Sequence, residues 1–65
     1  MLEKNDNSKE RILAAAVKLF AQKGFEGASI REICKEANAN ICMISYYWGG
    51  KQELYNCIIE DLIER

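Results

Sequence analysis

The sequence predicts an all-α fold, a three-helix bundle that contains a helix-turn-helix and is followed by the start of a fourth helix. Apolar residues recur at helical spacing in four segments of the chain. Short stretches rich in glycine or asparagine separate these segments, and proline is absent from the sequence. No segment alternates apolar and polar residues as a half-buried strand does.

The first helix is expected to begin near Asn7 or Ser8. Asn7 and Glu10 have the spacing of an N-cap and the acid of a capping box. One apolar face then consists of Ile12, Leu13, Ala16, Val17 and Phe20. Gly24 is expected to end this helix, because glycine adopts the left-handed conformation that a helix terminus requires.

The second helix is expected over residues 30–37, after a tight connection at 25–28. Ser29 and Glu32 have the spacing of a full capping box. The helix is expected to stop at Asn38, since asparagine tolerates left-handed geometry. Its apolar residues continue the helical period and are Ile30, Ile33, Cys34 and Ala37.

A three-residue turn at 38–40 separates the second helix from a third helix, expected at about 41–47. Asn40 is expected to cap the third helix, because asparagine side chains accept hydrogen bonds from the free amides of a helix start. Two short helices joined by such a turn and packed under a longer first helix form a helix-turn-helix.

The faces of the third helix differ in character. Ile41, Ile44 and Trp48 share one apolar sector and are assigned to the core. Trp48 is expected to pack against the first helix near Phe20 and Val17.

The remaining residues of the third helix lie outside this sector: Cys42, Met43 and Tyr46 point away from it, and Ser45 and Tyr47 flank it. Exposed aromatic and methionine side chains on one short helix indicate a binding surface. The alternative is that one or both tyrosines pack on the first or fourth helix.

A helix of this length, about 12 Å, fits the major groove of DNA, which is about 12 Å wide. Free amides and the helix dipole favour phosphate at a helix start. The starts of the second helix at Ser29 and the fourth helix at Lys51 offer the same property. The third helix is therefore a candidate for reading double-stranded DNA.

Gly49 and Gly50 are expected to break the chain before a fourth helix that runs from Lys51 onward. The apolar stripe of this helix consists of Leu54, Tyr55, Ile58, Ile59, Leu62 and Ile63. In a chain of 65 residues the last three have no expected partner, which predicts a longer natural protein or self-association.

Charge is unevenly distributed in a chain of net charge −1. Residues 1–51 hold eight basic against six acidic side chains, and residues 52–65 hold one basic against four acidic side chains. The basic residues therefore accompany the first three helices, which suits a partner of negative charge, although a charge imbalance of this kind is usually just a solvated face.

Other classes of protein find little support. Cys34, Cys42 and Cys57 form no C-x-x-C pair, and no histidine is present to complete a zinc site or serve as a catalytic base. Cys34 and Cys57 are instead expected to be small buried residues. No enzyme activity, cofactor or metal is expected. A cytoplasmic protein is expected, because the chain has neither a membrane span nor a signal peptide.

Several motifs occur in a specific order between residues 9 and 55. They are RILAAA (11–16), LF (19–20), KGF (23–25), SIREIC (29–34), EANAN (36–40), YYW (46–48) and KQELY (51–55). In order and spacing these motifs resemble the opening of TetR/AcrR-type transcriptional regulators. The resemblance covers most of the chain.

The resemblance implies a flexible segment at 1–8, a DNA-binding domain at 9–50 and, at 51–65, a helix leading to an absent domain that binds a small-molecule effector and forms a homodimer. It implies a sequence-specific regulator, with repression the expected action. By position, the residues that resemble the family's phosphate contacts are Ser29, Tyr47 and Lys51. The positions that face bases or nearby backbone correspond to Arg31, Asn40, Met43, Ser45 and Tyr46.

Departures from the family pattern also occur. Many members have tyrosine where this chain has Ser45, which suggests a different base preference. Trp48 replaces phenylalanine, and Asn38 and Cys42 replace glycine. Arg31 has a structural alternative, an ion pair with Glu32 or Glu36. The function of the whole chain also has an alternative: a protein-interaction module that docks through the fourth helix.

Overall fold

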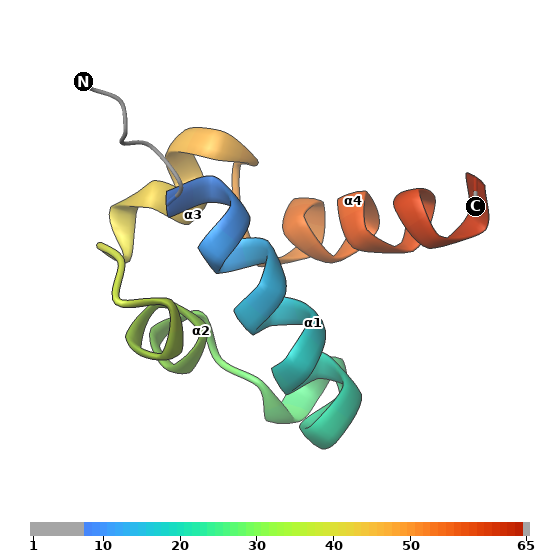
Figure 1. Cartoon of the computed structure of the whole chain (residues 1–65), viewed down its shortest axis with the longest axis horizontal. Helices are drawn as coiled ribbons and strands as arrows, with labels where there is room; N and C mark the ends of the chain where they lie inside the picture. Colours follow the sequence, from blue (N-terminus) through green and yellow to red (C-terminus); the bar gives the residue numbers. More distant parts are fainter. Residues whose placement is uncertain (1–7, 65) are drawn as a thin grey trace.

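The computed structural model describes residues 8–64, and these form four helices without a strand (Figure 1). The helices are α1 (Ser8–Gly27), α2 (Ile30–Ala37), α3 (Cys42–Tyr47) and α4 (Lys51–Glu64). The predicted all-α fold is confirmed. Asn7 and the rest of the expected flexible segment up to residue 7 lie outside the described residues.

The break at Gly24 lies within α1 rather than at its end. Gly24 has φ 79° and ψ 170°, so the helical path is interrupted there and resumes for one further turn up to Gly27. The amide of Ala28 donates to the Gly24 carbonyl at 3.1 Å, which closes that turn. The kink redirects the chain, and the ring of Phe25 packs against Phe20 and Tyr55.

α2 has the bounds that its caps predict. It ends at Asn38, which adopts the left-handed conformation with φ 56° and donates its amide to the carbonyls of Cys34 and Lys35. α1 supplies a second cap from outside the helix. Arg11 Nε donates to the Ala37 carbonyl at 3.0 Å, and Arg11 Nη2 lies 3.5 Å from the Asn38 carbonyl. A cation at this end of α2 also opposes the negative end of the helix dipole.

The core lies where α1 crosses the other helices, and it consists of one cluster of buried apolar side chains. Small residues on α1 and α2 let these two helices approach closely, while Ile44 and Leu54 anchor α3 and α4. The buried residues are Ile12, Ala15, Ala16, Leu19, Ala28, Ile33, Cys34, Ala37, Ile44, Leu54 and Ile58. Cys34 is buried as predicted, whereas Cys57 is only half-buried.

Two residues expected in the core are exposed. Ile41 is 47% exposed because α3 begins one residue later than expected, so that Ile41 lies at its N-cap, where the chain leaves the turn. Val17 is 45% exposed because it borders an open groove between α1 and α4. Trp48 packs on the core cluster but is only half-buried. The prediction that Trp48 is buried is therefore wrong, although the ring does pack on the core.

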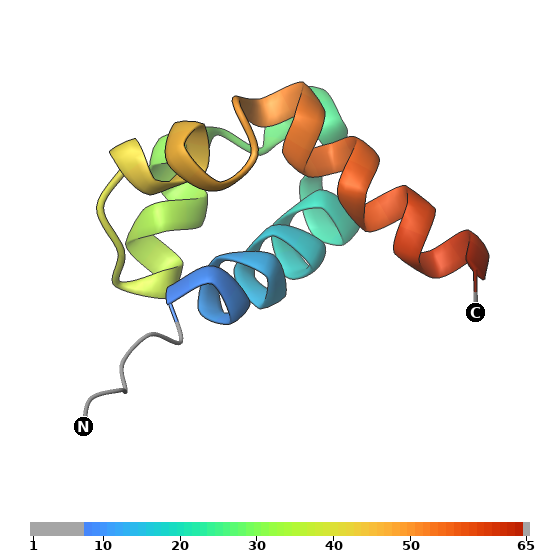
Figure 2. The ribbon, with the colours of Figure 1, turned by 90° about the horizontal axis from the view of Figure 1, so that it is seen from above.

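α4 extends beyond the bundle, as Figures 1 and 2 show. Its first two turns bury Leu54 and Ile58, but Leu62 and Ile63 are 59% and 76% exposed. These two residues have no partner in the core, as the sequence predicts. None of the helices among the described residues is both long and apolar enough to cross a membrane.

Candidate nucleic-acid interface

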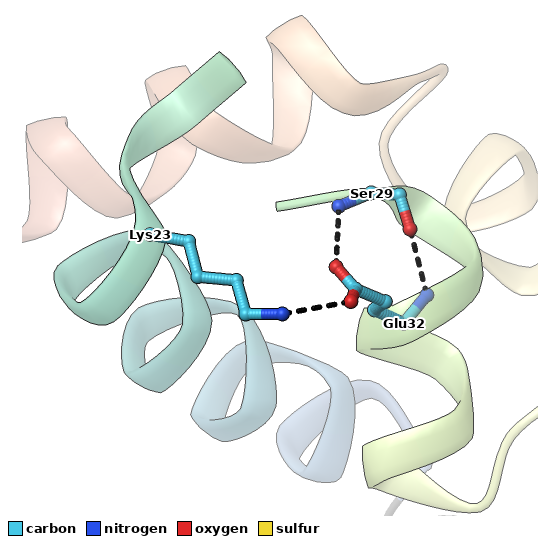
Figure 3. Close-up of polar contacts among 3 residues, drawn as sticks. All are labelled: Lys23, Ser29 and Glu32. Carbon is cyan, nitrogen blue, oxygen red and sulfur yellow. Dashed lines mark hydrogen bonds and ion pairs between the residues drawn. The ribbon is translucent and has the colours of Figure 1, made fainter. Parts of the chain in front are cut away.

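The start of α2 is a complete capping box (Figure 3). Ser29 Oγ accepts a hydrogen bond from the Glu32 amide at 3.0 Å, and the Ser29 amide donates to Glu32 Oε1 at 3.3 Å. A serine hydroxyl has one hydrogen to donate, and here the oxygen serves as the acceptor. The Ser29 side chain also helps to lower the pKa of the Glu32 carboxyl, and it lies exposed at the start of α2.

The acid of this capping box is held by a lysine of α1. Lys23 Nζ donates to Glu32 Oε2 at 2.8 Å (Figure 3). The hydrogen bond from Lys23, with the one from the Ser29 amide, lowers the pKa of the Glu32 carboxyl. Lys23 also offsets a negative charge that would otherwise stand alone beside the start of α2 and repel phosphate.

Arg31 lies exposed on the first turn of α2 and makes no hydrogen bond or ion pair with any other described residue. The acids expected as its alternative partners pair with lysines of α1 instead. Glu32 pairs with Lys23, and Glu36 pairs with Lys18 at 3.0 Å. Within the described part of the chain, no partner engages the Arg31 guanidinium, so its donors are available to a ligand.

Asn40 orders the turn before α3. Its Oδ1 accepts a hydrogen bond from the Cys42 amide at 2.8 Å, and its carbonyl accepts one from the Met43 amide at 2.9 Å. Ile41 rather than Asn40 occupies the N-cap position, so the expected cap is displaced by one residue. The Asn40 side chain still satisfies the first amide of the helix.

Residues of α3 divide between core and solvent. Ile44 is buried and holds the helix on the bundle, while Ser45 and Tyr46 are exposed, the latter by 80%. Met43 packs partly on the core, so the expectation that it points fully away is wrong.

Tyr47 links α3 to the first turn of α1. Its hydroxyl lies 3.0 Å from Ser8 Oγ, and Lys9 Nζ lies 5.8 Å from the centroid of its ring. The ring also meets those of Tyr46 and Trp48, with centroids 5.3 and 5.4 Å away. For Tyr47 the alternative of packing on the first helix is therefore correct, whereas Tyr46 remains exposed.

Lys51 is the first residue of α4 and is half-buried. Its ammonium nitrogen lies 4.4 Å from the centroid of the Phe25 ring. Figure 2 shows α3 and the beginning of α4 along one edge of the molecule, with the first turns of α1 along the opposite edge.

Sequence reasoning missed three side chains that shape this surface, namely Arg11, Lys23 and Phe25. A signal existed for the first, because Arg11 and Lys18 are seven residues apart and hence lie on one face of α1. Both reach α2, through the Ala37 carbonyl and Glu36. The contacts of Lys23 and Phe25 depend on the angles between helices and have no local signal. No group of three or more possible metal ligands occurs in the described part of the chain.

Four helices with a capped α2, a short turn and a partly exposed α3 define a helix-turn-helix DNA-binding domain. The family of bacterial regulatory proteins named for TetR matches residues 12–58, and the chain belongs to this family. Its members are transcriptional regulators and not enzymes.

Individual relatives agree with this assignment. The chain is 45% identical over 58 residues to the probable HTH-type transcriptional regulator YttP of Bacillus subtilis. This match covers 89% of this chain and 28% of YttP. It is 40% identical over 57 residues to the HTH-type transcriptional repressor NicS of Pseudomonas putida, covering 88% of this chain and 27% of that one.

A crystal structure of HlyIIR, a hemolysin II transcriptional regulator, superposes on this domain with a TM-score of 0.77. The two are 48% identical, and the match covers 83% of this chain and 30% of HlyIIR. The chain thus spans less than a third of the length of these relatives.

Proposed function

We propose that this domain reads an operator in double-stranded DNA by placing α3 in the major groove. The observation that carries this proposal is the division of α3 between a buried Ile44 and an exposed Tyr46, together with an exposed Arg31 on α2 that pairs with no other described residue. Arginine bonds guanine in bidentate fashion, and tyrosine adds apolar and hydroxyl contacts in a groove. Ser45 is exposed and extends this reading surface.

The phosphate backbone is the second element of the proposal. Ser29 and Lys51 lie at the starts of α2 and α4, where free amides add to the hydroxyl and the ammonium group. Tyr47 contributes its hydroxyl from the end of α3, where it now bonds Ser8. Phosphate contacts of this kind fix the register on the duplex and carry no base information.

Asn40 and Met43 have smaller roles in this proposal than sequence position implies. The Asn40 side-chain oxygen is engaged with the Cys42 amide, which leaves the amide nitrogen for a groove or backbone contact. Met43 is partly packed on the core and can offer only the outer part of its side chain to a base. Arg31, Ser45 and Tyr46 therefore carry most of the expected specificity.

The whole protein is proposed to be a cytoplasmic homodimeric repressor that releases DNA when its C-terminal part binds a small-molecule effector. Two relatives are named as transcriptional repressors, NicS of Pseudomonas putida and SCO4008 of Streptomyces coelicolor. The relatives are more than three times as long as the matched region, which leaves room for an effector and dimerisation domain.

Binding-site selection from a random duplex pool tests this function. The domain is fused to an unrelated dimerisation module, because paired half-sites require two reading heads about 34–36 Å apart or a multiple of that distance. We expect a palindromic consensus from the fusion, and dissociation constants of only about 10⁻⁴–10⁻⁶ M for the single domain. A fusion that binds duplexes without sequence preference would refute the reading head.

A further inference from the structure

Three aromatic rings surround the place where the kinked end of α1 meets α4. Phe25 follows the kink at Gly24, and its ring centroid lies 5.8 Å from that of Phe20 and 4.9 Å from that of Tyr55. Phe20 and Tyr55 also meet each other edge to face, at 5.1 Å. Phe25 is therefore held by two rings from two helices, and its orientation is fixed by the fold.

A cation also lies over the ring of Phe25. Lys51 Nζ lies 4.4 Å from the ring centroid, inside the roughly 6 Å range of a cation–π contact. Lys51 makes no hydrogen bond or ion pair with another described residue. The aromatic ring is thus the partner that holds its ammonium group.

An aromatic partner has a different consequence from a carboxylate partner. A carboxylate would neutralise the ammonium and compete with phosphate, whereas a ring attracts the cation through its quadrupole and leaves the net charge in place. A free lysine loses considerable side-chain entropy when it is ordered on a ligand. The ring of Phe25 orders Lys51 before any ligand arrives.

We propose that Phe25 is a positioning residue for DNA binding, which holds the Lys51 ammonium at the start of α4 in place for a backbone phosphate. This role rests on the proposed phosphate contact of Lys51. Phe25 itself touches no DNA in this proposal and acts only through the lysine.

A double-mutant cycle tests the role. The 65-residue chain is titrated with a random-sequence duplex at low salt, and fluorescence anisotropy gives the dissociation constant. The four proteins are the parent, Phe25→Leu, Lys51→Met and the double variant. Phe25→Leu should weaken binding about two- to fivefold in the parent and should cause no further loss in the Lys51→Met background.

Two further variants separate positioning from folding. Phe25→Tyr keeps an aromatic face toward Lys51 and should retain the affinity of the parent for the duplex. Ile12→Val removes a methyl group from a fully buried core residue that has no ring contact with Phe25, so it should lower Tm while leaving affinity unchanged below the melting range. Circular dichroism confirms that each variant is folded, and Phe25→Met replaces Phe25→Leu if the latter does not fold.

The outcomes distinguish this role from the proposed function. Parental or tighter binding by Phe25→Leu, beside weakened binding by Lys51→Met, overturns the role of Phe25 and leaves the phosphate contact standing. An equal loss from Phe25→Leu in both backgrounds also overturns it, because the ring would then act without the lysine. Parental binding by Lys51→Met overturns the phosphate contact and, with it, this inference.

Discussion

Arg11 Nε donates a hydrogen bond of 3.0 Å to the carbonyl oxygen of Ala37, which ties the first turn of α1 to the last turn of α2. The last carbonyls of a helix have no partner within it, and a guanidinium at that end satisfies them while opposing the dipole. The turn between α2 and α3 begins one residue later, at Asn38. Arg11 therefore fixes the point from which α3 departs.

Arg11→Met should lower the free energy of unfolding by about 1 kcal/mol, less than a buried charged hydrogen bond contributes, because the side chain is largely exposed. Urea unfolding followed by circular dichroism measures the loss. Arg31→Met is the matched control, since Arg31 has no polar partner among the described residues, and it should change stability by less than about 0.5 kcal/mol. Equal losses from the two variants would refute the capping role.

Glu32 should make stability depend on pH on the acid side. Its folded-state pKa is lowered, chiefly by the hydrogen bond from Lys23, so its contribution is present above the unfolded-state pKa of about 4.3 and is lost as pH falls through the folded value. Glu32→Gln should therefore lower Tm at about pH 7 and lose that effect at about pH 2.

A control for this pH dependence is Glu36→Gln, which removes a similar exposed ion pair, with Lys18, that belongs to no capping box. It should lower Tm at neutral pH less than Glu32→Gln does. Thermal melts of the parent and both variants across the acid range decide the matter. A deficit of Glu32→Gln that persists undiminished in acid would contradict the assignment.

Truncation of Ile41, at the N-cap of α3, and of Ile44, within α3, should change the free energy of unfolding by very different amounts. Ile44 is fully buried, and Ile44→Ala should cost about 2–5 kcal/mol, a large share of the stability of a domain this small. Ile41 is 47% exposed, and Ile41→Ala should cost about 1 kcal/mol or less. Thermal unfolding of both variants checks this, and similar losses would mean that the face of α3 is misassigned.

Arg31 and Lys51 should differ in how their loss depends on DNA sequence. Lys51→Ala should weaken binding to every duplex about equally and reduce the salt slope by about one ion, as a phosphate contact does. Arg31→Ala should weaken the selected site most and relax the base choice at one position, with a discrimination of about 1–3 kcal/mol.

Titration of these two variants with the selected site and a scrambled site, at two salt concentrations, separates the roles. The dimeric fusion used for site selection serves as the parent. An equal loss on both sites for Arg31→Ala would make Arg31 a phosphate contact rather than a base contact.

Local signals in the sequence determined the helices and their ends. The capping box of Ser29 and Glu32, the left-handed stop at Asn38 and the start of α4 at Lys51 all occur where the sequence predicts them. Gly24 was predicted to end the first helix, and it does interrupt the helical path, but one more helical turn follows it. These features depend on residues within a few positions of one another. The local backbone geometry of a helix cap or stop is the same whatever fold surrounds it.

Tertiary structure alone decided which side chains meet across the helices. Ile41 is exposed and Met43 partly covered because α3 starts one residue later than expected and is held on the bundle by Ile44. The contact of Lys51 with Phe25 joins residues 26 positions apart. Such contacts depend on the angle and depth at which helices pack, and these are set by the whole core rather than by any short stretch of chain.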